Sequence, residues 1–182
     1  MKKFKMNLKN ENIIKASLIL LMIVVGVGLR FSSEIPNFTP MFAIALFSGY
    51  FFRNKFVAVS TPLIIQIITD YFLGFHADMF SVYLSFTLIS FLGIINKDKY
   101  SFGSSVSYSI ISAFMFYLIT NFSVWLTADF YAKDFSGLVS CYTLALPFFK
   151  NTLISSVSFS VILFGIYSLM LKTDYMSLVK SK

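Results

Sequence analysis

Residues 13–31, IIKASLILLMIVVGVGLRF, form an apolar run whose charged members, Lys15 and Arg30, lie near its two ends. A helix needs about 20 mostly apolar residues to cross a hydrocarbon core about 30 Å thick. The lysines before the run resemble the start of a secretory signal, but small residues at A-x-A spacing do not follow it. We therefore predict a retained first membrane helix.

Charged residues separate further apolar runs along the chain. The second run is short, so it must pack against protein neighbours or lie where the bilayer is thinned. The sequence therefore predicts an all-α membrane protein with one bundle of six transmembrane helices over residues 13–171, between cytoplasmic tails 1–12 and 172–182. The five runs after the first are 39–53, 56–74, 79–96, 103–126 and 150–171.

The composition excludes a soluble domain. Of the 182 residues, 57% are hydrophobic and only 13% are charged, whereas soluble domains carry about 25% charged residues. The net charge is +7, but the basic residues lie at the chain ends and in short loops between apolar runs. That distribution is typical of membrane topology and argues against a nucleic-acid partner, so the predicted partner is the lipid bilayer.

The distribution of basic residues predicts the orientation. With six spans and both ends in the cytoplasm, 12 of the 15 lysines and arginines lie on the cytoplasmic side. If the apolar run 135–149 were a seventh span, the division would be 9 to 6. The positive-inside rule therefore favours six spans, and we expect 135–149 to be an outer re-entrant or interfacial segment.

Polar residues gather at the predicted outer ends of the helices. Gln66 and Asp70 are four residues apart, so they share one face of the third helix. A carboxylate inside a membrane span is costly and needs a partner. Asp70 is therefore either a contact for a bound solute or the structural partner of Arg30 or Lys150.

A second group lies on the fifth helix. Tyr117, Asn121 and Trp125 follow one another at four-residue spacing. Two aromatic rings around an amide can sandwich a planar ligand and bond its edge. The alternative is an aromatic belt at the membrane interface, where Trp and Tyr normally gather.

His76 and Cys141 are the single histidine and the single cysteine. No local pair of zinc-ligand residues, nucleophile elbow, HExxH, P-loop or GxGxxG motif is present. The sequence therefore predicts no metal site, no cofactor and no catalytic residue. A membrane enzyme using Asp70, His76 and Cys141 is the second alternative, and packing of Cys141 as a small buried residue is the simpler interpretation.

The start of the second run resembles a helix entry. Asn37 or Thr39 can cap a helix, and Pro40 suits its first turn. Ala45 and Gly49 follow at small-xxx-small spacing, which allows close helix contact. We expect this small-residue face to pack against other helices of the same chain. The alternative is that a partner membrane protein docks on it.

With these residues in place, the chain resembles an uncharacterised family of small bacterial inner-membrane proteins, without an established activity. The resemblance implies a bacterial inner-membrane location. It is carried by blocks between residues 37 and 165: Asn37-Phe38-Thr39-Pro40 with Ala43 to Gly49, Asp70 with Gly74 and His76, Val82-Tyr83 with Phe86, Thr120-Asn121-Phe122 with Trp125, and Gly137-Leu138 with Cys141-Tyr142, Pro147-Phe148-Phe149 and Asn151.

At the level of fold, six short helices with outward polar residues are similar to the S components of energy-coupling factor vitamin transporters. The chain also resembles, in size and helix content, the rod-shape protein of the elongation machinery. The S-component resemblance implies a solute bound from outside and a partner membrane protein in an energy-coupling module. A solitary cobalamin-transporting relative places a cysteine near the cobalt, which draws attention to Cys141.

We therefore expect a protein that binds a small, vitamin- or cofactor-like solute at the outer face and helps to import it. The first alternative is a structural or assembly subunit without ligand, which predicts a packed outer cluster. The expected contacts lie on the first outer loop, the third and fifth helices and the last outer segment: Asn37, Thr39, Asp70, His76, Asn121, Trp125, Cys141 and Tyr142.

Overall fold

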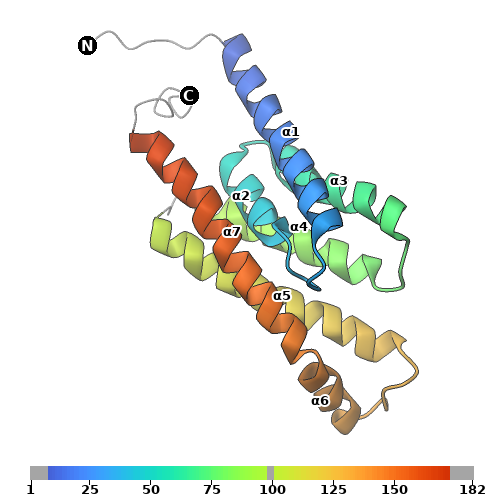
Figure 1. Ribbon diagram of the computed structural model, residues 1–182. Helices are drawn as coiled ribbons and strands as arrows, with labels where there is room; N and C mark the ends of the chain where they lie inside the picture. Colours follow the sequence, from blue (N-terminus) through green and yellow to red (C-terminus); the bar gives the residue numbers. More distant parts are fainter. Residues whose placement is uncertain (1–7, 98–100, 173–182) are drawn as a thin grey trace.

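The computed structural model describes residues 8–97 and 101–172, and within them the chain is all α-helix, with no strand. The predictions for residues 1–7 and 173–182 of the tails therefore lie outside the described residues, as do Lys99 and the other basic residues there. Seven helices follow one another in the described part (Figure 1): α1 (Leu8–Ser32), α2 (Met41–Phe51), α3 (Lys55–Leu73), α4 (Met79–Asn96), α5 (Phe102–Thr127), α6 (Phe135–Leu144) and α7 (Leu146–Lys172).

Five of these helices are long and apolar enough to cross a membrane. Their apolar stretches are Asn12–Ser32, Lys55–Leu73, Met79–Asn96, Phe102–Thr127 and Leu146–Leu169. Large side chains such as Leu20, Phe56, Phe80 and Ile110 are exposed on them. Because water would not tolerate so much exposed apolar surface, the protein is a multi-pass membrane protein.

Helix α2 is the centre of the bundle. Every residue from Met41 to Tyr50 is buried, and α1, α3, α4, α5 and α7 all contact it. Its 11 residues give a length of about 17 Å, less than the bilayer core. The sequence predicted a span at 39–53, and the structure instead shows a short helix surrounded by protein.

Two glycines allow α2 and α4 to pack with their backbones in contact. A Cβ atom on Gly49 would lie 1.9 Å from the carbonyl oxygen of Ser90, and one on Gly93 would lie 2.1 Å from that of Leu46. Only glycine fits at either position. The small-residue face predicted around Ala45 and Gly49 therefore serves contact within the chain.

Helix α3 contains a proline, and α2 compensates for it. Pro62 has no N–H to donate to the carbonyl of Ala58 one turn earlier. The hydroxyl of Ser48 donates to that carbonyl at 2.7 Å. Ser48 is fully buried, so the hydrogen bond lost within one helix is replaced by a neighbouring helix in a region without water.

The segment predicted to be re-entrant or interfacial, 135–149, is divided between two helices. Asp134 accepts the N–H of Gly137 at 2.7 Å and starts α6. A break at Ala145 follows, and α7 begins at Leu146, earlier than the predicted start of 150. Pro147 lies in the first turn of α7, where a missing N–H costs no helical bond.

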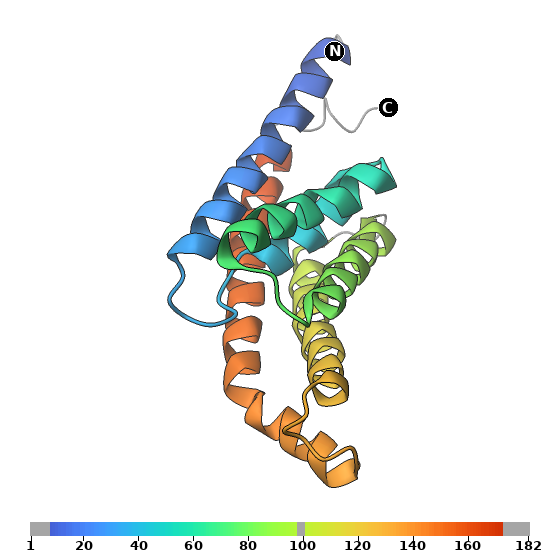
Figure 2. The same cartoon turned by 90° about the vertical axis from the view of Figure 1, so that its right-hand side faces the viewer.

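The connections alternate between the two ends of the bundle (Figures 1 and 2). Loops 33–40, 74–78 and 128–134 lie toward one end, which we call the distal end. Residues 52–54 and the C-terminal end of α7 lie toward the other, where α1 also begins. Helix α2 therefore returns the chain from the distal end although it is short.

Candidate functional site

An ion pair joins α1 to α3 at the distal end. A guanidinium nitrogen of Arg30 lies 2.6 Å from Oδ1 of Asp70, and the other terminal nitrogen donates to the side chains of Gln66 and Thr69. The hydroxyl of Tyr83 donates to Oδ2 of Asp70 at 2.9 Å. Since both carboxylate oxygens are engaged and Asp70 is buried, Asp70 orients Arg30 and does not itself line a cavity.

Two adjoining cavities lie beside this ion pair. The smaller has a volume of about 180 Å³ and the larger about 220 Å³. Residues Asn37, His76, Val82 and Phe116 line both. The smaller is lined in addition by Arg30, Thr39, Met41, Phe42, Gln66 and Phe86, and the larger by Asp78, Tyr117, Thr120, Asn121, Val124, Ala145, Phe148, Phe149 and Thr152.

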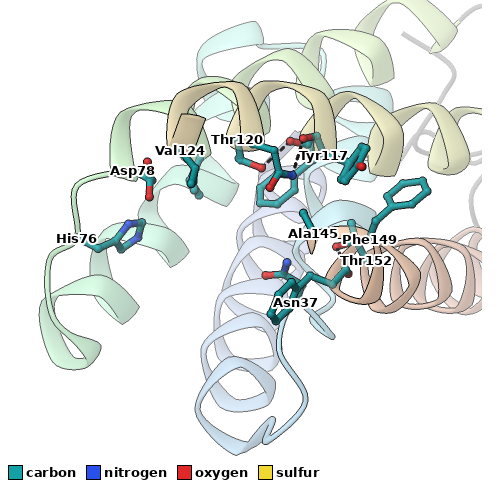
Figure 3. Close-up of a pocket in the computed structure, with 13 residues that line it drawn as sticks. Asn37, His76, Asp78, Tyr117, Thr120, Val124, Ala145, Phe149 and Thr152 are labelled. Atoms are coloured by element: carbon teal, nitrogen blue, oxygen red, sulfur yellow. Dashed lines mark hydrogen bonds between the residues drawn. The ribbon is translucent and has the colours of Figure 1, made fainter. Parts of the chain in front are cut away.

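Each cavity alone is below the range of about 300–1,000 Å³ typical of ligand pockets. The two share lining residues and lie next to one another, so together they offer room for a small molecule. Their polar side chains come from loop 33–40, the loop after α3 and helices α1, α3, α5 and α7, and Figure 3 shows those of the larger cavity.

Loop 33–40 is fastened so that Asn37 reaches both cavities. The side-chain amide of Asn151 donates to the carbonyl of Pro36 at 3.1 Å, and the hydroxyl of Ser155 donates to the carbonyl of Asn37 at 3.2 Å. Asn37 has φ 61, a left-handed conformation that asparagine adopts more readily than most residues. Helix α7 therefore positions this amide.

Several hydrogen-bonding groups in the cavities are unused within the described part of the chain. The amide nitrogen of Asn121 donates to the carbonyl of Tyr117 at 2.8 Å, while its oxygen accepts no bond from residues 8–97 or 101–172. The side chains of Asn37 and His76 likewise make no hydrogen bond to those residues. In Figure 3 they extend from two different loops toward the larger cavity. These groups are free to meet a ligand.

Aromatic rings form one wall of the larger cavity. The rings of Tyr117 and Phe149 lie 4.6 Å apart between centroids, and Phe116 packs edge-on against Phe42 at 5.0 Å. The hydroxyl of Tyr117 donates to the carbonyl of Tyr142 at 2.6 Å. The wall is held in place from both α6 and α2.

Helix α6 covers the distal ends of α5 and α7. The thiol of Cys141 donates to the carbonyl of Asn121 at 3.4 Å, and the hydroxyl of Tyr142 donates to that of Leu118 at 2.7 Å. The indole of Trp125 donates to the carbonyl of Ala132 at 2.9 Å. None of these three predicted contacts lines either cavity. They hold α6 and loop 128–134 against α5.

The structure thus separates the predicted contacts into two groups. Asn37, Thr39, His76 and Asn121 line the cavities, and the hydroxyl of Thr39 also accepts the N–H of Met41 at 3.1 Å. Asp70, Trp125, Cys141 and Tyr142 lie behind them. Sequence reasoning did not identify the cavity-lining Arg30, Gln66, Asp78, Phe116 and Phe149 as contacts. The sequence suggested Arg30 only as a partner for Asp70, which it is.

Burial affects the thiol of α6, which is not among the five long apolar helices. It raises the pKa of the Cys141 thiol above the usual value of 9.0, while a hydrogen bond with Tyr131 acts in the opposite direction. The thiol is therefore neutral and weakly nucleophilic near neutral pH. Within the described residues no group of three or more His, Cys, Asp or Glu side chains is placed to hold a metal ion.

A family model described as a family of unknown function, DUF6580, matches residues 10–178. The chain belongs to this family. The match covers all seven helices except the first two residues of α1, so the DUF6580 unit includes the whole bundle and both cavities. The comparisons with curated proteins and with solved structures found no match.

Proposed function

We propose that this protein binds a small, vitamin- or cofactor-like solute in the two distal cavities and helps to import it. The observation that supports this most is the pair of adjoining cavities, whose lining combines aromatic rings with the side-chain amide of Asn37 and the unused amide oxygen of Asn121. Small-molecule sites combine apolar walls with a few placed polar groups in this way.

In this proposal the distal end faces the outside of a bacterial inner membrane. The described basic residues near the proximal end include Arg53, Lys55 and Lys97, whereas Arg30 lies at the distal end paired with an acid. Both termini are then cytoplasmic, with five long helices crossing the bilayer and α2 completing the return inside the bundle.

Import needs an energy source, and the sequence carries no nucleotide-binding motif. We therefore include a partner membrane protein of the kind that S components use. The bundle is too small for a transporter built from two inverted repeats, so rocking or toppling against such a partner would carry the solute.

The alternatives make different predictions. A structural or assembly subunit predicts a packed distal cluster, against which the two cavities weigh. An enzyme using Asp70, His76 and Cys141 predicts that the three side chains converge. Asp70 instead contacts Arg30 and Tyr83, and Cys141 contacts Asn121.

The direct test is to purify the protein in mild detergent and identify co-purifying small molecules by mass spectrometry. We expect one compound at a substantial fraction of the protein concentration, and its loss in Asn121→Leu. Asn12→Leu, at an exposed position on α1 at the opposite end, is the matched control. A wild-type protein that is folded and carries no solute, and that binds none when cell extract is added, would contradict the proposal.

A further inference from the structure

The larger cavity contains a carboxylate without a cationic partner. Asp78 lies at the N-terminus of α4, where its side chain makes no capping hydrogen bond. The hydroxyl of Ser123 donates to its Oδ1 at 3.3 Å. No lysine or arginine of the described ranges pairs with Asp78, and its Oδ2 accepts no hydrogen bond there. The carboxylate also lies near the positive end of the α4 dipole.

Two basic residues near the cavities, Arg30 and Lys133, are already engaged, and the exposed Lys150 on α7 lines neither cavity. Arg30 is neutralised by Asp70 at 2.6 Å, and the ammonium group of Lys133 donates to the carbonyl oxygens of Trp125 and Ala128. His76 is the one residue lining the larger cavity whose side chain can carry a positive charge. With a neutral imidazole the larger cavity has a net negative charge.

The aromatic wall of the larger cavity also favours a positively charged ligand. The rings of Tyr117 and Phe149 line the cavity beside Phe116 and Phe148, and aromatic faces attract cations through their negative quadrupole. Such an attraction strengthens where water is excluded. An anion would face both the Asp78 carboxylate and these ring faces, and both would repel it.

We infer that the solute is a small organic monocation with a flat body, its positive group near Asp78 and its flat body beside the aromatic side chains that line the same cavity. The side-chain amide of Asn37 and the amide oxygen of Asn121 then bond polar atoms on its edge. This inference rests on the proposed function and adds the charge of the ligand, which the proposal leaves open.

The test uses three probes of nearly equal shape: 1-methylnicotinamide, nicotinamide and nicotinate, which are cationic, neutral and anionic. Binding to the full chain in lipid nanodiscs is measured by calorimetry at pH 8, where nicotinamide is neutral and nicotinate is an anion. We expect the cation to bind at least about tenfold more tightly than the neutral amide, because the ring cation is attracted to the Asp78 carboxylate and the neutral ring is not. The anion should not bind measurably.

Variants assign the preference to one residue. Asp78→Asn should lower cation affinity about tenfold or more and remove most of the difference in affinity between the cation and nicotinamide, while Asp78→Glu should retain the preference. Asp129→Asn is the matched control, since Asp129 lines neither cavity. Phe149→Leu should also weaken binding of the cation. This variant tests the inference independently if Asp78→Asn does not fold.

The outcomes separate the two claims. Equal or tighter binding of nicotinamide or nicotinate, or a co-purified solute that is an anion, would overturn the cation inference and leave solute binding in place. A cation preference that persists in folded Asp78→Asn would also overturn it. If no probe binds and no compound co-purifies, the proposed function itself fails, and the inference with it.

Discussion

Arg30, in the last turn of α1, places a guanidinium nitrogen 2.6 Å from the carboxylate of Asp70 on α3. Helix α1 is the most exposed of the long helices, and this pair attaches its distal end to the bundle. Arg30 also lines the smaller cavity. The attachment of α1 and the shape of the site are therefore linked through one side chain.

Asp70→Asn should destabilise the protein strongly. It leaves the charge of Arg30, whose side chain is 18% exposed, without a counter-ion, and breaking a buried pair costs about 3–5 kcal/mol. We expect the lower part of that range because Arg30 keeps some access to water. Chemical unfolding in detergent measures the loss. The double variant Asp70→Asn with Arg30→Met should recover part of the loss, and purely additive effects would show that the pair is not coupled.

Ser48→Ala should cost about 1–3 kcal/mol, because it leaves the Ala58 carbonyl buried without a donor. Pro62→Ala restores an N–H one turn after Ala58, so the effect of Ser48→Ala should largely disappear in the Pro62→Ala background. A double-mutant cycle of unfolding free energies checks this. Equal costs in both backgrounds would contradict the assigned role of Ser48.

Gly93→Ala should prevent close packing of α2 on α4, since its Cβ would lie 2.1 Å from the Leu46 carbonyl oxygen. We expect a cost of at least about 2 kcal/mol or failure to accumulate in the membrane. Gly28→Ala is the matched control, because nothing lies within 4 Å of its Cβ and alanine favours helix by up to about 1 kcal/mol. Similar behaviour of the two variants would refute the close contact.

Cys141 should react slowly with thiol reagents in the folded protein at pH 7.5 and rapidly after denaturation, because it is buried and its pKa is raised. A thiol with a higher pKa in the folded state binds its proton more tightly there. The folded state should therefore lose stability as pH rises above the unfolded value of about 9. Cys141→Ser should lack that part of the pH dependence. Fast labelling of the native thiol would contradict its burial.

The hydrophobic runs predicted most helices well. The predicted spans 56–74 and 79–96 agree with α3 and α4 within one residue at each end. Each helix that faces lipid must by itself be apolar and long enough to cross the bilayer, so its own sequence determines its bounds. Two boundaries depended on tertiary context. Helix α2 is shorter than its apolar run. It is surrounded by neighbouring helices, so it does not need the length of a helix that faces lipid. The last span was predicted to start at 150, but α7 begins at Leu146 and has Pro147 in its first turn.

The site was harder to predict because residues on one helix face can serve different purposes. Asn121 and Trp125 are one turn apart, yet Asn121 lines the larger cavity while Trp125 donates to the Ala132 carbonyl. Asp78 is not part of a pattern of polar residues at helical spacing, such as the one that pointed to Asn121. Its importance depends on the absence of a nearby cation, which only the packed bundle shows.

The central claim, that the distal cavities are reached from outside the cell, is tested most directly by sided labelling of Thr120→Cys in a Cys141→Ser background. Thr120 lines the larger cavity. A small membrane-impermeant thiol reagent should modify this cysteine in intact spheroplasts, while Arg53→Cys, in the exposed proximal loop, should react only in inside-out vesicles. Labelling of Thr120→Cys in inside-out vesicles alone would contradict the account.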